Sequence, residues 1–481
     1  MPLLDAVDKP AVTQESGDYA RPGRPLVPTA RRRIAGYWLL RLSTALAVGA
    51  AAFLVWTWLA GWAAQGLDFS VYWYGGKILN DAGAAPSDLY GPSFAWAGGP
   101  GLPFTYPPFA ATIFALFARL PQHTALTLFN SAGVVVAVWV AGRTVRYWNA
   151  KTDWRSTFRS PASRWAAAIL ALAVLNLGPW RETLAFGQIN ILLMGLMAAD
   201  LLVRKPRWSK GIPGSGFLVG VAAGIKLSPL VFGLYFLVRK DWRGLLNMGM
   251  GFASTVLIGW LLRPAESLQF WLEILPDTSR IGGAGYVDNL SLKGALLHFG
   301  VPETSVTVPW LLLSLLVVGT AAVIIRTASL QGSRVVAIST TALTMLLISP
   351  VSWSHHWVWM AAVLPAFAWT LRETPLRSRG TRWLMGGVVG VSTLVFLYSP
   401  KTIGEALGAE NLDIQSPGLW IMASSAGVFC ALAIMVSWLV VLRRSLPVPA
   451  AELGGRWVRP GAEPAGVRAP AAGTPPVGWS A

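Results

Sequence analysis

The residues best placed to do chemistry lie in a polar, aromatic, glycine- and proline-rich segment at residues 66–108. An acid, Asp68, stands near its start, where the chain should emerge from a preceding apolar run. Two tyrosines of this segment, Tyr72 and Tyr106, could share a site with the acid. Long structured loops between short-looped elements are usually functional. Asp68 is therefore the first candidate for a catalytic carboxylate.

Other polar residues gather in clusters that have no topological reason to be polar. One isolated lysine, Lys226, also lies near the centre of an apolar run, far from either end. Polar residues at membrane depth usually face a cavity and are functional candidates. The clusters contain Arg181, Gln188 and Asn190, then Asn289 and Lys293, and finally His355 and His356. We expect these clusters to share one cavity at the outer membrane interface.

These residue types suit the transfer of a sugar from a phosphate carrier to a hydroxyl group. The hydroxyl must lose its proton as it attacks, whereas a lipid phosphate leaves as a stabilised anion and needs no acid. One general base is therefore sufficient, and Asp68 has the right chemistry for it. The phosphate charge needs cationic or hydrogen-bonding partners. His355, His356, Lys226, Lys293 and Arg181 could provide them.

Each candidate also has an ordinary structural interpretation. Asp68 is a good N-cap residue for a helix over 69–80. The tyrosines are more typical of anchors at a membrane interface than of platforms for a sugar. Gln188 and Asn190 could simply form hydrogen bonds between helices.

The two adjacent histidines are candidates of unequal weight. Neighbouring residues point to different sides of a helix, so at most one of them should face the site, and we favour His356. No other acid or histidine stands at metal-ligand spacing to them, so we expect no metal ion and no other cofactor.

The elements that must position these residues are membrane helices. Of the 481 residues, 54% are hydrophobic and only 13% are charged, which excludes an ordinary soluble domain. Apolar runs of about 17 residues or more recur along the chain, and each can nearly cross a bilayer as a helix. The sequence predicts an all-α, polytopic membrane protein with about 10–12 transmembrane helices and interfacial helices in its outer loops.

The net charge of +17 does not indicate nucleic acid as a partner. Lys and Arg cluster in short loops between the apolar runs, as the positive-inside rule expects. The single cysteine, Cys430, lies within an apolar run and excludes a disulfide framework.

The chain divides into a membrane domain at 37–442 and two tails, 1–36 and 443–481, whose composition predicts disorder. Basic residues beside both tails place them in the cytoplasm. The basic loops 143–164 and 204–210 fit this topology if 104–142 crosses once and the run 216–238 is a broken hairpin with Lys226 at its tip. Twelve full crossings are the alternative.

Six segments together resemble a known family. They are LDFSVYWYGGKIL, GLPFTYPPFAA, GQINILLMGLM, AAGIKLSPL, DNLSLKGAL and SPVSWSHHWVW. In this order they are similar to the actinobacterial, polyprenol-phosphate-sugar-dependent glycosyltransferases of the GT-C superfamily, and most similar to the phosphatidylinositol mannoside α-1,2-mannosyltransferases. The resemblance covers roughly residues 60–360.

The resemblance implies a GT-C-like bundle in the plasma membrane, with the active site just outside the bilayer. It implies a β-linked polyprenyl-phospho-mannose donor, a phosphatidylinositol mannoside-type acceptor and a catalytic acid in the first outer loop, where Asp68 matches. Many GT-C enzymes carry paired acids there, whereas this chain has the sequence DFS. Three alternatives remain open: arabinofuranosyl transfer, mannosyl transfer to a lipoglycan, and a lipid or sugar transporter.

The topology can be tested by labelling. In a variant without Cys430, a cysteine introduced into loop 143–164 or loop 204–210 should resist an impermeant thiol reagent in intact cells, because both loops are expected in the cytoplasm. A cysteine in the 66–108 segment is the positive control. Labelling of both basic loops from outside would contradict the single crossing at 104–142.

Overall fold

The computed structural model describes most of the predicted membrane domain. The residues described are 49, 66–81, 89–91, 94–96, 99–148, 160–202, 215–277, 280, 282–374, 376, 378–406 and 424–442. Both predicted tails and nearly all of the first apolar run, 37–63, lie outside the described residues, so the domain boundaries stay predictions.

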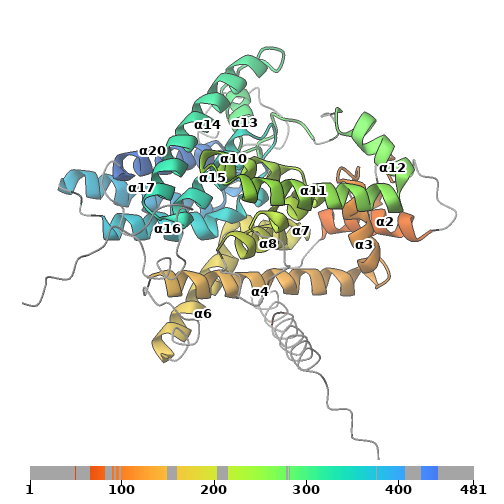
Figure 1. Ribbon diagram of the computed structural model, residues 1–481, viewed down its shortest axis with the longest axis horizontal. Coiled ribbons are helices and arrows are strands. Elements are labelled where there is room, and N and C mark those ends of the chain that lie inside the picture. The colour runs from red at the N-terminus through yellow and green to blue at the C-terminus, as the bar shows by residue number, and fades with distance from the viewer. Residues whose placement is uncertain are drawn as a thin grey trace, which may run out of the picture. The chain divides into compact units, whose positions relative to one another are not determined.

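The described residues form helices almost throughout (Figure 1). One short antiparallel pair, β1 (Phe94–Trp96) and β2 (Gly99–Leu102), interrupts them. The helices of the first half are α2 (Leu67–Asn80), α3 (Pro108–Phe117), α4 (Gln122–Trp148), α6 (Pro161–Asn176), α7 (Gly178–Phe186), α8 (Asn190–Leu202), α9 (Phe217–Ile225), η2 (Ser228–Phe232), α10 (Gly233–Val238) and α11 (Trp242–Leu262). Those of the second half are α12 (Pro264–Gln269), the π-helix η3 (Phe270–Ile274), α13 (Leu292–His298), α14 (Thr307–Leu330), α15 (Arg334–Ile348), η5 (Ser354–Trp359), α16 (Met360–Glu373), α17 (Arg379–Tyr398), α18 (Pro400–Ala406) and α20 (Ala426–Leu442).

Four of the described helices, α4, α11, α14 and α17, are long and apolar enough to cross a bilayer. A fifth candidate is the pair α6 and α7, which meet at a bend of 67°. On α14, Leu312, Leu315 and Leu316 are each more than 60% exposed, as expected of side chains that face lipid. The predicted all-α polytopic membrane protein is confirmed, while the total of 10–12 crossings stays a prediction.

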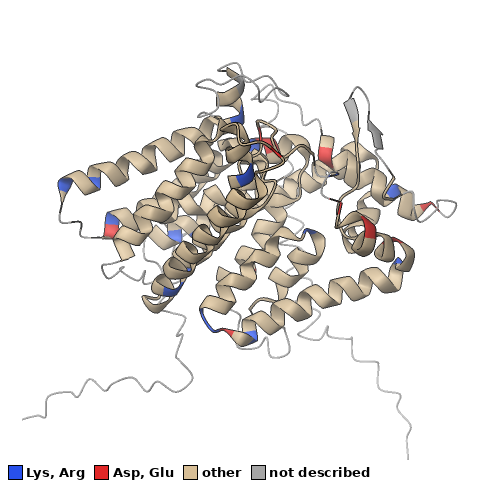
Figure 2. Cartoon of the chain, turned by 90° about the horizontal axis from the view of Figure 1, so that it is seen from above, with Lys and Arg blue, Asp and Glu red and all other residues tan. Residues whose placement is uncertain are grey.

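Charged residues lie mainly at helix ends and in connections, and the middles of the long helices are uncharged (Figure 2). Within 104–148, the one long candidate span is α4, because α3 has only 10 residues. This agrees with the single crossing predicted for 104–142. Which side of the membrane each loop faces stays a prediction.

Helices α9 and α11 pack closely through their glycines. They run in the same direction, because Gly216 lies against Gly244, and Gly224 lies against Thr255 further along both helices. A Cβ at Gly224 would stand 1.8 Å from the Thr255 hydroxyl oxygen. Small residues at such interfaces let membrane helices approach closely.

The chain reverses at Lys226, as the predicted hairpin requires. Lys226 ends α9 with an extended backbone, φ −145° and ψ 127°. Helix α10 then returns beside α11, where Gly233 lies near Met248 and Gly244 lies against Phe236. This reversal places the Lys226 side chain at the tip, where the helix has no further turn to pack against it.

The other end of α9 is fixed by a buried acid on the preceding helix. One carboxylate oxygen of Asp200 accepts hydrogen bonds from the backbone N–H groups of Gly216, Leu218 and Val219, at 2.8, 3.0 and 3.3 Å. The first N–H groups of a helix have no partner within the helix, so Asp200 satisfies three of them from outside. It thereby ties α8 to α9.

The glycine contacts predict opposite effects of the same substitution. Gly220→Ala should lower the free energy of unfolding by about 1–3 kcal/mol, because its Cβ would stand 2.0 Å from the Met248 backbone oxygen. Gly249→Ala on α11 meets nothing within 4 Å and should be neutral or stabilise by about 0.5–1 kcal/mol. Melting temperatures in detergent test both. Equal effects would contradict this account of the packing.

Candidate active site

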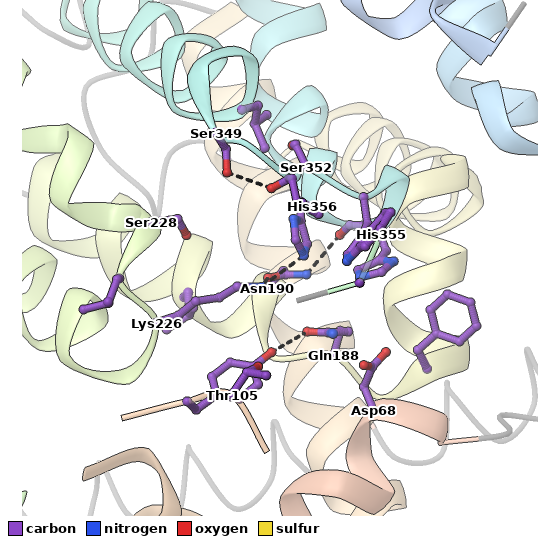
Figure 3. Close-up of a pocket in the computed structure, with 18 of the residues that line it drawn as sticks. Asp68, Thr105, Gln188, Asn190, Lys226, Ser228, Ser349, Ser352, His355 and His356 are labelled. Atoms are coloured by element: carbon purple, nitrogen blue, oxygen red, sulfur yellow. Dashed lines mark hydrogen bonds between the residues drawn. The ribbon is translucent and has the colours of Figure 1, made fainter. Parts of the chain in front are cut away.

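One cavity of about 990 Å³ collects most of the predicted residues (Figure 3). Its walls come from α2, the 102–107 segment, the start of α8, the α9–η2 break, the loops 282–288 and 349–353, and η5. These segments are distant in sequence. Eight predicted site residues line it: Asp68, Tyr72, Tyr106, Gln188, Asn190, Lys226, His355 and His356.

Asp68 lies in the first turn of α2, but it does not cap the helix. Helix α2 begins at Leu67, its N-cap residue is Gly66, and no side chain forms a capping hydrogen bond. The Gly66 backbone has φ 63°, a left-handed conformation that favours glycine, and its N–H donates to Ala185 O at 2.8 Å. The helix over 69–80 thus starts earlier than predicted. The capping interpretation of Asp68 is wrong, and its carboxylate lines the cavity instead.

A tyrosine–glutamine network supports Asp68. The Tyr72 hydroxyl donates to Gln188 Oε1 at 2.7 Å and lies 2.7 Å from the Tyr106 hydroxyl, which also donates to Gln188 Oε1 at 3.4 Å. With its oxygen engaged by the tyrosines, Gln188 turns its amide nitrogen to Asp68, and Figure 3 shows the two side chains together. Tyr72 is almost fully buried and stacks on Phe114, so this network is rigid.

Burial raises the pKa of Asp68 to about 6, while the Gln188 hydrogen bond and the positive charge of Lys226 act in the opposite direction. A carboxylate with a pKa close to neutral pH is ionised and can still accept a proton, which is what a general base requires. The Tyr72 and Tyr106 hydroxyls have raised pKa values because of burial, so they remain neutral donors.

Lys226 and His356 form a second functional group, which we call the lysine–histidine pair. The Lys226 ammonium lies 3.1 Å from His356 Nε2 and donates to Asn190 Oδ1 at 3.0 Å. Burial lowers the pKa of His356 well below its usual range, and the Lys226 charge acts in the same direction. The imidazole is therefore neutral and accepts from lysine. An ammonium has three N–H donors, so one remains to meet a ligand.

His355 also lines the cavity, although we expected only one of the two histidines to face the site. Its ring is buried and stands edge-on to His356 and Phe186. Both ring nitrogens lack a hydrogen-bond partner. Its backbone oxygen accepts from Thr183 at 2.7 Å and from Asn190 at 3.2 Å, which locks η5 against α7 and α8. Because η5 is a 3-10 segment next to a kink, adjacent side chains can share one cavity.

Three predicted residues lie elsewhere than in the cavity wall. Asn289 is fully buried and acts as a clip: its amide donates to Ala284 O and Pro350 O, and its Oδ1 accepts from the Ser352 N–H. The Arg181 guanidinium donates to a backbone oxygen at 3.4 Å, and the Lys293 ammonium lies 5.8 Å from an indole ring. None of the three lines the cavity.

Sequence reasoning missed three charged residues that do line the cavity: Arg280, Asp288 and Lys401. Asp288 directly precedes the predicted Asn289, so the same sequence motif contains the residue that lines the cavity. Arg280 and Lys401 lie in loop and helix-end segments without any apolar pattern around them. Only the tertiary fold brings them to the site.

Within the described part of the chain, no three His, Cys, Asp or Glu side chains converge on one point. These residues therefore offer no candidate metal site.

The site brings the Asp68 carboxylate and the Lys226 ammonium into one cavity, on a helical scaffold with hydrophobic spans. Such a polar cavity in a helical membrane protein is typical of an integral membrane enzyme. The chain belongs to glycosyltransferase family 87, whose family model matches residues 104–350, about half of its length. The resemblance to polyprenol-phosphate-sugar-dependent glycosyltransferases is thereby confirmed.

Several mycobacterial enzymes are similar over most of the chain. Two are polyprenol-phosphate-mannose-dependent α-(1-2)-phosphatidylinositol mannoside mannosyltransferases. The enzyme from Mycolicibacterium smegmatis is 36% identical over 71% of this chain and 76% of its own length. The enzyme from Mycobacterium tuberculosis is 33% identical over 70% and 78%. A pentamannoside mannosyltransferase from M. smegmatis is 31% identical over 78% and 86%. Comparison with solved structures finds no significant match.

The environment of Asp68 predicts its titration. The band of its protonated carboxyl group, isolated by infrared difference spectra against Asp68→Asn, should disappear as the pH rises through about 6. Gln188→Leu removes a hydrogen bond that favours the charged form, so it should move this midpoint to higher pH. Asp81→Asn, at the exposed end of α2, should leave the band unchanged. A midpoint near 4, the ordinary value for aspartate, would contradict this environment.

Proposed function

We propose that the protein transfers mannose from polyprenyl-phospho-mannose to a phosphatidylinositol mannoside-type glycolipid at the outer membrane face. The observation that carries this proposal is a cavity of about 990 Å³ whose lining includes both Asp68 and the lysine–histidine pair. Membership of glycosyltransferase family 87 supports the reaction class. The names of the mycobacterial relatives support both substrates.

Asp68 is the general base in this proposal. The acceptor oxygen forms a bond to the anomeric carbon of mannose as the bond from that carbon to the phosphate oxygen breaks. The hydroxyl proton passes to Asp68, and the electron pair of the broken bond leaves with the phosphate. A single displacement of this kind inverts the anomeric configuration, from a β-linked donor to an α-linked product. No acid is needed, because the phosphate is a stable leaving group.

The lysine–histidine pair binds the donor phosphate. The Lys226 ammonium meets the phosphate directly, while Asn190 and the neutral His356 hold it in place. A hydrogen bond from an ionised donor to a phosphate is among the stronger polar interactions in proteins. It grows in importance as negative charge develops on the leaving oxygen. The unpartnered ring nitrogens of His355 provide another group for the same ligand.

The competing hypotheses have less support. The relatives named above act on mannose donors, which favours mannose over arabinofuranose. Their acceptors differ in size, from phosphatidylinositol mannoside to the pentamannoside, so the class of acceptor is proposed here and not the number of its sugars. A transporter is disfavoured by the glycosyltransferase family.

The outer placement of the cavity and the cytoplasmic location of both termini belong to the same proposal. They are supported by the basic residues of loops 143–164 and 204–210, which the positive-inside rule assigns to the cytoplasm. A lipid-linked donor also fits this placement, because its polyprenyl tail stays in the bilayer while its sugar reaches a site at the interface.

The role of Asp68 decides the mechanism. Asp68→Asn and Asp68→Ala should both reduce mannosyl transfer by at least ~10²-fold, the lower range for loss of a general base. Because Asp68 does not cap α2, neither change should lower the melting temperature appreciably. The assay incubates purified protein with polyprenyl-phospho-mannose and phosphatidylinositol mannosides and measures lipid masses, with Asp81→Asn as the matched control. A fully active Asn variant would refute the assignment of the base.

A further inference from the structure

A second polar wall lies in the same cavity, and the mechanism above does not use it. We call Tyr286, Asp288, Ser352, Trp353 and Lys401 the distal wall; all five line the cavity. They come from the loop before α13, the loop before η5 and the first turn of α18.

The wall that contains the lysine–histidine pair and the distal wall each pair a different lysine with a different carboxyl group. Lys226 is the lysine whose charge acts on Asp68, whereas Lys401 is the lysine whose charge acts on Asp288. His355 is influenced by both lysines, and both lower its pKa together with burial. His355 is therefore close enough to both lysines to be influenced by their charges. The cavity is thus lined by both charged groups and by a histidine that has no partner for either ring nitrogen.

The charges of the distal wall do not suit a phosphate. Burial and the nearby Glu182 raise the pKa of Asp288 to about 7, and Lys401 acts in the opposite direction. A phosphate here would share the Lys401 ammonium with the Asp288 carboxyl group, and Glu182 beside Asp288 adds negative charge, so like-charge repulsion would oppose its binding. A sugar is neutral, and its hydroxyl groups can donate to the carboxylate and accept from the ammonium at once.

Two further features indicate a sugar ring as the ligand. Ser352 is 1% exposed and lines the cavity, yet its hydroxyl oxygen lacks a hydrogen-bond partner. A buried polar group of this kind is costly to leave unpaired. Beside it, the Trp353 and Tyr286 rings stand perpendicular with centroids 5.8 Å apart. Binding sites typically combine such aromatic surfaces with a few placed polar groups.

The fold holds the distal wall in place. The Asn289 clip joins the two loops that carry Asp288 and Ser352. The Asp288 carboxylate accepts from the Ser354 N–H at 3.3 Å, and the Ser354 hydroxyl donates to Glu182.

The position of Lys401 is fixed by a strained turn. Ser399 has φ 79° and ψ 130°, a conformation that non-glycine residues rarely adopt. It is packed so closely on Gly178 that a Cβ there would stand 2.5 Å from the Ser399 Cβ. The turn directs α18, and with it Lys401, to the cavity. Such strain persists only where the surrounding structure enforces it.

We propose that the distal wall is the acceptor subsite: Asp288, Ser352 and Lys401 bind hydroxyl groups of the acceptor sugar, and Trp353 contacts its ring. This proposal rests on the proposed function, and it assigns the two walls to the two substrates. The donor phosphate binds at the lysine–histidine pair, and the acceptor sugar enters from the distal wall and presents its hydroxyl to Asp68. A direct transfer requires both substrates at once, and the cavity of about 990 Å³ is at the upper end of the usual range for ligand pockets.

The test compares apparent KM values for the two substrates. Lys401→Met and Asp288→Asn should each raise the KM for the phosphatidylinositol mannoside acceptor by at least about tenfold, as expected for loss of a hydrogen bond to a charged group. The KM for polyprenyl-phospho-mannose should change by less than about twofold. Lys226→Gln should show the reverse pattern. Lys77→Gln is the control, because Lys77 is exposed and lies over Trp73 outside the cavity.

Three outcomes would overturn the assignment. A rise in the donor KM would place the distal wall in the donor site. A fall in kcat with both KM values unchanged would indicate that the distal wall only positions η5 and does not bind the acceptor. An unchanged acceptor KM in Lys401→Met would exclude this lysine from the acceptor subsite. If Asp288→Asn lowers the melting temperature, the Lys401→Met variant decides the test, because Lys401 is only half-buried and its replacement should disturb the fold less.

A direct binding measurement separates this proposal from the proposed function. Calorimetric titration of phosphatidylinositol mannoside into the detergent-solubilised protein needs no donor and no transfer. If wild-type protein transfers no mannose but binds the glycolipid, and Lys401→Met binds it at least about tenfold more weakly, the function fails while the subsite stands. If wild-type transfers mannose and Lys401→Met binds the glycolipid as well as wild type, the subsite fails alone.

Discussion

The amine of Lys226 imposes the main constraint on this structure. A charged group far from water is unfavourable unless it is paired and hydrogen-bonded. The fold meets this condition by ending α9 at Lys226 and bringing Asn190 and His356 to the ammonium. Each partner comes from a different part of the chain. Pairing one half-buried cation therefore brings together the α9–η2 break, the start of α8 and the η5 segment, and these form one wall of the cavity.

The functional groups stand where helices are interrupted. Asp68 follows the left-handed Gly66, Lys226 ends α9, the histidines lie in a 3-10 segment beside a kink, and Lys401 follows the strained Ser399. Irregular backbone at membrane depth is tolerated only where it lines a cavity or is buried in protein. Straight helices such as α14 and α17 form the hydrophobic surround. The irregular segments supply the chemistry.

The cavity has two charged walls, and this division suits a reaction between two lipid-linked substrates. A phosphate and a sugar require different binding groups. A phosphate binds to positive charge that no nearby acid neutralises, whereas the hydroxyl groups of a sugar bind to hydrogen-bond donors and acceptors placed side by side. The lysine–histidine pair contains no carboxylate, whereas Lys401 lies near Asp288 and Glu182. The proposed base, Asp68, is influenced by the Lys226 charge and so is associated with the first wall.

The sequence by itself determined the class of protein, because membrane insertion depends on the length of apolar runs and on the basic residues in the loops, and both are local properties of the sequence. It also identified Asp68, Lys226, Gln188, Asn190 and the two histidines, since a polar residue beside or inside an apolar run is conspicuous.

The sequence could not exclude that Asp68 caps a helix, because the start of α2 depends on the left-handed Gly66 and its contact with Ala185. Nor could the sequence tell which of Asp288 and Asn289 lines the cavity. In the fold, the Asn289 side chain is buried and joins two loops by hydrogen bonds, whereas the adjacent Asp288 lines the cavity. Lys401 carries no local signal, and the strained turn at Ser399 alone directs it inward. The tertiary structure decided these points, because they depend on contacts between segments far apart in the sequence, such as that between Gly178 and Ser399.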